Sequence, residues 1–165
     1  MRGILQSLEV SDQTTNTLFE NRYFTPTDLL IMARALAKLH AQNSDVYIAT
    51  AATSNSRDEA FYQRRRAELL AVRSGELGGV ETFFSTKGQA LTMTPRRTAV
   101  AAFPFDDVAW TEVTQRAFRA ATEDLRKGDT KGASLLFAST GTVTPAATAE
   151  LEKLGWKIVK LKPVR

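Results

Sequence analysis

The sequence predicts a single α/β domain over residues 1–165, with a mixed sheet of about six strands and about four helices. The alternative is an α+β arrangement of the same elements. Short β-prone runs alternate with segments of helical periodicity along most of the chain. No Pro-rich or Ser-rich linker divides it. With 165 residues, 43% of them hydrophobic, the chain is long enough to bury one core of its own.

Four segments place apolar residues at helical spacing and carry capping residues at their starts. In the first, Pro26 stands at the first helical position, Asp28 lies in the first turn and His40 falls at the end. In the third, Asp106 or Asp107 is expected to cap the helix. The four predicted helices cover residues 25–41, 54–75, 108–129 and 145–155.

Six runs are predicted as strands from their β-branched and aromatic content. Residues 46–53 and 133–139 are apolar without alternation, which favours strands buried on both faces of a parallel sheet. A tight turn at Lys87 and Gly88 is expected to begin a pair of hairpins. The six predicted strands cover residues 46–53, 80–86, 89–95, 96–103, 133–139 and 156–163.

Two stretches share one pattern, a buried strand followed by a hydroxyl-rich loop and a helix. They span residues 44–61 and 133–151. This predicts two related βαβ halves, as an internal pseudo-repeat of residues 21–86 and 98–162. The alternative is that two unrelated segments have converged on a pattern that is common in α/β proteins. In either case the two loops would lie at the carboxyl ends of strands, where open α/β sheets bind ligands.

The second of these loops is the first candidate ligand site. Gly141 would let backbone N–H groups approach an anion, and threonine hydroxyls would donate beside the start of a helix. The alternative is that Thr144 serves only as the helix cap. The candidate ligand-binding residues are Ser139, Thr140, Gly141, Thr142 and Thr144.

The first of these loops is the weaker candidate. It carries hydroxyl and amide side chains from Thr50 to Ser56 but no glycine that would allow a close approach to phosphate. Neither loop has the glycine pattern of a P-loop or of a dinucleotide-binding fold.

Basic residues define two further candidate surfaces. Arg57, Arg64 and Arg66 give a basic stripe along the second predicted helix, with local ion pairs to neighbouring acids as the alternative. The net charge is +4, and residues 81–165 hold the whole excess. The basic carboxyl-terminal strand, through Lys157, Lys160 and Lys162, is a candidate contact for nucleic acid, and its alternative is a solvated edge strand.

Several chemistries are excluded by composition. The chain has no cysteine and one histidine, so it carries no disulfide, thiolate zinc site, cysteine nucleophile or histidine metal cluster. The adjacent carboxylates at 106–107 and 123–124 would splay apart and make no acid–base pair. We therefore expect no cofactor and no metal, name no catalytic residue, and favour a protein that is not an enzyme.

The sequence also bears on location. No apolar run approaches the roughly 18–20 residues of a membrane span, so membrane insertion is not expected. The first residues lack the apolar length of a secretory signal, which favours a cytoplasmic protein, or an extracytoplasmic one if a leader has been removed.

Three stretches, LFENRYFTPTDLLIMARALAKL, DVYIATAATS and YQRRRAELLAV, occur in an order that resembles OmpA-like peptidoglycan-binding domains. In that family an Asp after the strand and an Arg in the Arg-Arg-Ala step hold the peptidoglycan peptide. The resemblance covers about half the chain and places Arg66 at the Arg position, while residues 51–53 stand where the Asp would be. It implies a cell-envelope module as one alternative.

These observations together favour a non-enzymatic binding or assembly module whose partner is another protein. The alternatives are a small anion- or phosphate-ligand protein or enzyme that uses the 139–144 loop, the peptidoglycan-binding module, and a nucleic-acid binder. A homo-oligomer formed through a sheet edge is a further option.

Overall fold

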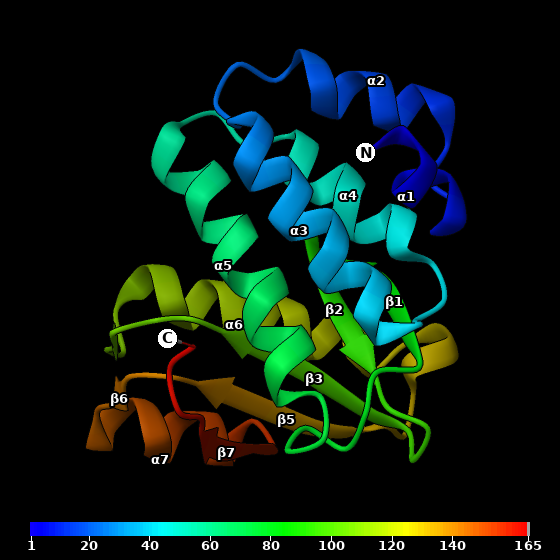
Figure 1. The fold of residues 1–165 in the computed structure, drawn as a ribbon. Helices are drawn as coiled ribbons and strands as arrows, with labels where there is room; N and C mark the ends of the chain where they lie inside the picture. The colour runs from blue at the N-terminus through cyan, green and yellow to red at the C-terminus, as the bar shows by residue number, and fades with distance from the viewer. Residues whose placement is uncertain (165) are drawn as a thin grey trace.

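The computed structural model describes residues 1–164 and is a mixed α/β fold (Figure 1). Its α-helices are α1 (Arg2–Ser7), α2 (Asp12–Glu20), α3 (Pro26–Leu39), α4 (Ser44–Ala52), α5 (Arg57–Arg73), α6 (Glu112–Leu125) and α7 (Pro145–Lys153). Its strands are β1 (Thr82–Thr86), β2 (Gln89–Met93), β3 (Thr98–Phe103), β4 (Asp107–Val108), β5 (Ser134–Ser139), β6 (Thr142–Val143) and β7 (Trp156–Lys160). A 3-10 turn covers Gly128–Thr130.

The main sheet has five strands in the order β1-β2-β3-β5-β7. The first three form two antiparallel hairpins, as predicted, whereas β3, β5 and β7 run parallel to one another. The parallel connections pass through α6 and α7. The carboxyl ends of the parallel strands therefore share one edge of the sheet with the turn of the β1–β2 hairpin.

Helices cover both faces of this sheet. On one face, α3, α4 and α5 pack over side chains such as Phe83, Val100 and Ala138, and α1 and α2 lie outside them. Figure 1 shows α2 farthest from the sheet and α7 on the opposite side. On that other face, α6 and α7 enclose a second core that includes Phe137 and Trp156. No helix within residues 1–164 has the length and apolar character needed to cross a bilayer.

The helix predicted from residue 25 is confirmed as α3. The Thr25 hydroxyl accepts the backbone N–H of Asp28, and the Asp28 carboxylate accepts the backbone N–H of Thr25, so the two residues form a capping box ahead of Pro26. His40 ends the helix in the left-handed conformation, with φ 50°. The helix predicted over 54–75 is confirmed as α5, which Ser56 caps.

The strand predicted over residues 46–53 is wrong, because residues 46–52 belong to helix α4 and Thr53 caps its end. The helix is enclosed on two sides, by α2 and by the β1–β2 hairpin, so Tyr47, Ile48 and Ala51 are all fully buried. A helix buried on two sides shows no amphipathic period, and periodicity alone does not distinguish it from a buried strand. The unit at 44–61 thus starts with a helix, and its strand–loop–helix likeness to residues 133–151 does not hold.

The start of the third predicted helix is also corrected. Residues Asp107 and Val108 form β4, which pairs in parallel with Thr142 and Val143 of β6. Thr111, not an aspartate, caps α6 by accepting the backbone N–H of the third helical residue. Tertiary pairing with a segment more than thirty residues later has overridden the local capping signal.

The remaining differences concern the number of elements. Helices α1 and α2 are not predicted from the sequence, and their buried side chains Leu5 and Leu18 pack in the core with α3 and α4. Residues 1–164 thus form seven α-helices where about four were expected, and a five-stranded sheet with a separate two-stranded pair where one sheet of about six was expected. The other predicted helix and strands, α7, β5 and β7, are confirmed.

Candidate functional site

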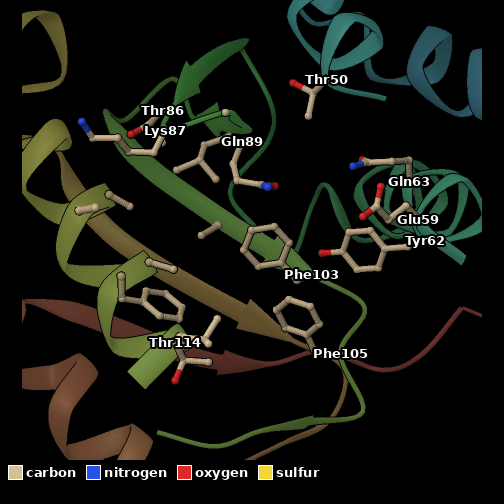
Figure 2. Close-up of a pocket in the computed structure, with 18 of the residues that line it drawn as sticks. Thr50, Glu59, Tyr62, Gln63, Thr86, Lys87, Gln89, Phe103, Phe105 and Thr114 are labelled. Atoms are coloured by element: carbon tan, nitrogen blue, oxygen red, sulfur yellow. The ribbon is translucent and has the colours of Figure 1, made fainter. Parts of the chain in front are cut away.

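A cavity with a volume of about 680 Å³ lies within the described residues. It lies at the edge of the sheet where β3 ends, between the first half of α5, the β1–β2 turn and α6 (Figure 2). Ligand sites in proteins commonly have volumes of about 300–1,000 Å³ and lie at the carboxyl ends of parallel strands. Both its size and its place in the fold therefore mark this cavity as the candidate site.

The cavity exists because β2 and β3 separate. Their pairing covers only Thr92 with Val100 and Met93 with Ala99, whereas β1 pairs with β2 over its full length. Beyond Thr92 the guanidinium of Arg66 enters between the two strands. Figure 1 shows β2 and β3 diverging from their paired ends.

Arg66 replaces the missing strand pairing with side-chain hydrogen bonds. Its Nε donates to the carbonyl of Ala102 at 3.0 Å, and its Nη2 donates to the carbonyl of Ala90. The guanidinium carbon lies 4.4 Å from the ring centre of Phe103 and 5.6 Å from that of Tyr47. Arg66 thus holds the hairpin and β3 apart at a fixed distance. Cation–π contacts with the two aromatic rings stabilise its charge.

Small side chains widen the gap between α6 and the sheet. Ala117 and Ala121 stand four residues apart on α6 and face Ala101 of β3 across the cavity. The end of α6 is held firmly, since Thr122 accepts the indole N–H of Trp156 at 2.8 Å. The beginning of α6 is less well covered, since Val113 lines the cavity and is 76% exposed. The first half of α6 therefore overhangs the cavity with an incompletely covered apolar stripe.

One wall of the cavity is aromatic. The ring centres of Phe103 and Phe105 are 5.1 Å apart, and those of Phe105 and Tyr62 are 5.8 Å apart, with interplanar angles of 28° and 19°. These three near-parallel rings come from β3, from the segment after it and from α5. Figure 2 shows them along one side of the cavity. Such a wall offers a flat surface to an apolar or aromatic ligand.

The α5 side of the cavity is polar. Gln63 is 8% exposed, and its Oε1 is buried with no hydrogen-bond partner among residues 1–164. Figure 2 shows the amide nitrogen of Gln63 directed into the cavity, with the Tyr62 hydroxyl and the Glu59 carboxylate on the same side. Glu59 is exposed, and its Oε2 already accepts the backbone N–H of Asn55 at 2.8 Å. The amide nitrogen of Gln63 is therefore a hydrogen-bond donor that faces the cavity.

Tyr62 presents a neutral hydroxyl to the cavity. Burial raises the pKa of Tyr62 to about 12, although the positive charge of Arg66, one helical turn away, lowers it in part. The phenol is therefore protonated at neutral pH and able to donate a hydrogen bond. Lys87, in the hairpin turn, is on the opposite rim, and Figure 2 shows its ammonium pointing away from the cavity.

The 139–144 loop lies outside this cavity, and its polar groups bond within the protein. The N–H groups of Thr142 and Thr144 donate to the carbonyls of Asp106 and Val108 at 2.9 and 3.0 Å. The Thr144 hydroxyl caps α7, which is the structural alternative the sequence left open. Anion binding by Ser139, Thr140, Gly141, Thr142 and Thr144 stays a prediction.

This loop nevertheless contributes to the cavity indirectly. The Thr140 hydroxyl donates to the carbonyl of Phe105 at 3.0 Å, and the backbone N–H of Gly141 donates to the Ser139 hydroxyl at 3.3 Å. The first bond ties the loop to the segment that carries the Phe105 ring, and the second lies within the loop. The loop is therefore a support of the aromatic wall.

The predicted basic stripe on α5 is not a free surface. Arg57 and Arg64 both pair with the buried carboxylate of Asp28, at 2.8 and 3.4 Å, as in the local ion-pair alternative. Arg66 is 1% exposed, so its assignment as a surface contact is wrong. Its long side chain reaches inward because it lies on the face of α5 that covers the sheet.

The carboxyl-terminal lysines are exposed but do not share one face. Lys157 and Lys160 stand at odd and even positions of β7, so their side chains leave opposite faces of the sheet. Lys162 follows the strand, and its carbonyl accepts a hydrogen bond from Arg73 at 3.0 Å. Contact of these lysines with nucleic acid stays a prediction.

The hydroxyl-rich loop after residue 50 proves closer to the site than expected. The cavity is lined by Thr50 from the last turn of α4 and by Thr53, Ser54 and Asn55, which follow this helix and not a strand. Sequence reasoning missed the aromatic wall and Gln63. The one available signal was Phe103 and Phe105 on either side of a proline at the end of a strand.

Comparison with known proteins finds no matching family model, no matching curated protein and no matching solved structure. The resemblance to OmpA-like domains also lacks its structural basis here. The strand that it implies before residue 53 is α4, and the arginine that it would use, Arg66, is buried. The candidate site therefore has to be interpreted from its own chemistry.

Proposed function

We propose that this protein is a non-enzymatic binding module that takes a small organic ligand with a flat apolar body into the cavity between α5, α6 and β3. The single observation that carries this proposal is the cavity of about 680 Å³, bounded by three near-parallel aromatic rings. The amide of Gln63, beside the Tyr62 ring, supports it, because its nitrogen faces the cavity (Figure 2) and can donate a hydrogen bond to a ligand.

The incompletely buried stripe of α6 also supports this proposal. Val113, Ala117 and Ala121 recur at every fourth position and line the cavity. A bound ligand would remove their apolar surface from water and add about 25 cal/mol for each Å² that it buries. Ligand binding is therefore expected to stabilise the packing of α6 on the sheet.

The wider prediction of a protein partner is less well supported. The large apolar side chains exposed within residues 1–164 are Met1, Phe61, Val72 and Val113. They come from three different helices or their flanks, and the ring of Phe61 is covered by the guanidinium groups of Arg57 and Arg64. Assembly with another protein stays a prediction with no particular surface attached to it.

The test is titration of the protein with 2-naphthalenemethanol, 2-naphthoate and 2-naphthylmethylammonium, followed by calorimetry and by the NMR signals of alanine methyl groups. We expect saturable binding of at least one probe at one site, with shifts at the Ala117 and Ala121 methyls. Ala117→Leu and Ala121→Leu should each weaken that binding at least tenfold by filling the cavity. Ala146→Leu, at an exposed alanine on α7, is the matched control.

Two results would contradict the proposal. One is the absence of saturable binding for all three probes. The other is binding that Ala146→Leu weakens as much as the two α6 variants do, because that would place the probe elsewhere.

A further inference from the structure

The geometry points to a carboxylate as the polar group of the ligand, so that the cavity takes an aromatic or otherwise flat apolar carboxylic acid in its ionised form. The carboxylate would accept hydrogen bonds from the Gln63 amide and the Tyr62 hydroxyl, in the positive potential of Arg66. This inference rests on the proposed function, because it names the ligand class of the same cavity.

The first step is the charge of Arg66. It is 1% exposed, and no carboxylate among residues 1–164 lies within ion-pairing distance of its guanidinium. Its Nη1 also lacks any hydrogen-bond partner within those residues. A buried cation without a counter-charge is costly, and an anion that binds nearby reduces that cost. The described part of the chain thus leaves one buried positive charge unbalanced.

The second step is the path from Arg66 to the cavity. The ring of Phe103 is 4.4 Å from the guanidinium carbon on one side and forms part of the cavity wall on the other. Tyr62 lies one turn from Arg66 on α5. The positive charge of Arg66 lowers the pKa of Tyr62, whereas burial raises it. An anion against this wall therefore lies in the positive field of Arg66 through material of low dielectric constant.

The third step is the hydrogen-bonding capacity of the polar side. The Gln63 amide nitrogen and the Tyr62 hydroxyl both face the cavity (Figure 2), and both are donors at neutral pH. A carboxylate has two oxygens and can accept a hydrogen bond from each of these two donors. A phosphate group carries more charge and a third terminal oxygen, for which the residues within 1–164 that line this side of the cavity offer no further buried donor.

The other charged groups at the cavity do not change this balance. Glu59 and Lys87 have opposite charges and are both exposed to water, which screens them. Glu59 is the one group that would attract a cationic ligand, and one of its oxygens is already bound to the backbone N–H of Asn55. The buried charge of Arg66 therefore determines the preference.

The experiment uses the three naphthyl probes, which have nearly the same shape and differ in charge. At neutral pH we expect the native protein to bind 2-naphthoate at least tenfold more tightly than 2-naphthalenemethanol, and the ammonium compound most weakly. Gln63→Met and Tyr62→Phe should each weaken 2-naphthoate about fivefold or more and change the binding of the alcohol less than twofold. Gln115→Met, on the outer side of α6, is the control for amide removal.

Arg66→Met tests the source of the charge preference, with Arg116→Met on α6 as its control. We expect Arg66→Met to abolish the preference for 2-naphthoate over the alcohol. Because this variant removes a wedge between two strands, its folding is checked by circular dichroism, and Gln63→Met and Tyr62→Phe test the inference independently of it.

The outcomes separate this inference from the proposed function. If 2-naphthalenemethanol binds at the Ala117 and Ala121 methyls as tightly as 2-naphthoate, the carboxylate assignment is overturned and the proposed function stands. A preference for 2-naphthoate that both Gln63→Met and Tyr62→Phe leave intact would also overturn it. If no probe binds, the proposed function itself fails.

Discussion

Gly141 lies directly against the backbone of Asp106: a Cβ at position 141 would be 1.6 Å from the Asp106 carbonyl oxygen and 2.5 Å from that of Phe105. The same carbonyl of Asp106 accepts the backbone N–H of Thr142 at 2.9 Å. The glycine is therefore needed for the close approach of β4 and β6. This gives Gly141 a structural role at the position where the sequence suggested an anion site.

The first prediction concerns this contact. Gly141→Ala should lower the free energy of unfolding by about 2 kcal/mol or more, because the added methyl has to push two backbone segments apart. Chemical denaturation measures the change. Gly75→Ala is the control, since a Cβ there meets nothing within 4 Å, and it should leave stability unchanged or slightly raised. Equal stability of the two variants would show that β4 and β6 are not packed this closely.

The second prediction concerns acid stability through Asp28. Burial raises the pKa of this carboxyl, but the hydrogen bonds from Thr25 and the charge of Arg57 outweigh burial and hold the pKa below its ordinary value of 3.8. The ionised form thus stabilises the fold, fully above the unfolded pKa, and this contribution is lost as the pH falls through the folded pKa. Asp28→Asn should cost about 2 kcal/mol at pH 7 and flatten the loss of stability below pH 4.

Urea denaturation of Asp28→Asn between pH 7 and pH 2 measures both effects. The control is Asp58→Asn, an exposed carboxylate in the first turn of α5 that has no ion pair within residues 1–164. It should change stability little and keep the acid transition of the native protein. An unchanged acid transition in Asp28→Asn would contradict the assignment.

The third prediction concerns alkaline stability through Tyr62. Its pKa is raised to about 12 in the folded protein, above the ordinary value of 10, so between these values the unfolded chain has released a proton that the folded chain retains. Stability therefore falls as the pH rises, by about 1.4 kcal/mol at pH 11 from this residue. Tyr62→Phe should remove that part of the fall.

The measurement is the difference in unfolding free energy between pH 9 and pH 11 for the native protein and for Tyr62→Phe. Tyr23→Phe, which removes a phenol whose oxygen accepts a bond from Arg22 at the surface, is the control and should fall as the native protein does. If Tyr62→Phe loses as much stability at pH 11 as the control, the hydroxyl is not in a buried environment.

Local chemistry predicted a large part of this fold. Thr25 with Pro26 and Thr144 with Pro145 mark the starts of α3 and α7, because a hydroxyl cap and a proline at the first position act within one turn of chain. Lys87 and Gly88 form the turn between β1 and β2 for the same reason: both take positive φ.

The candidate site was much less predictable. The sequence led to the 139–144 loop through the rule that ligands bind after parallel strands. That rule points to the edge of the sheet where the cavity lies, but the 139–144 loop does not line the cavity. The cavity depends on where the pairing of β2 with β3 ends, and the sequences of the two strands do not indicate that position. Arg66 looked like one member of a charged run, although its side chain is the wedge between these strands.

The sequence by itself determined the α/β class, the hairpins, the order of β5, α7 and β7, and the helices whose one apolar face or capping residues act over a few positions. The tertiary structure alone decided that residues 44–52 form a helix, that Arg66 points inward, and that a cavity opens beneath α6. The physical reason is the range of the forces involved. Caps, turns and amphipathic periods act between near neighbours, whereas complete burial erases those patterns and cavities arise where distant elements do not fill the space between them.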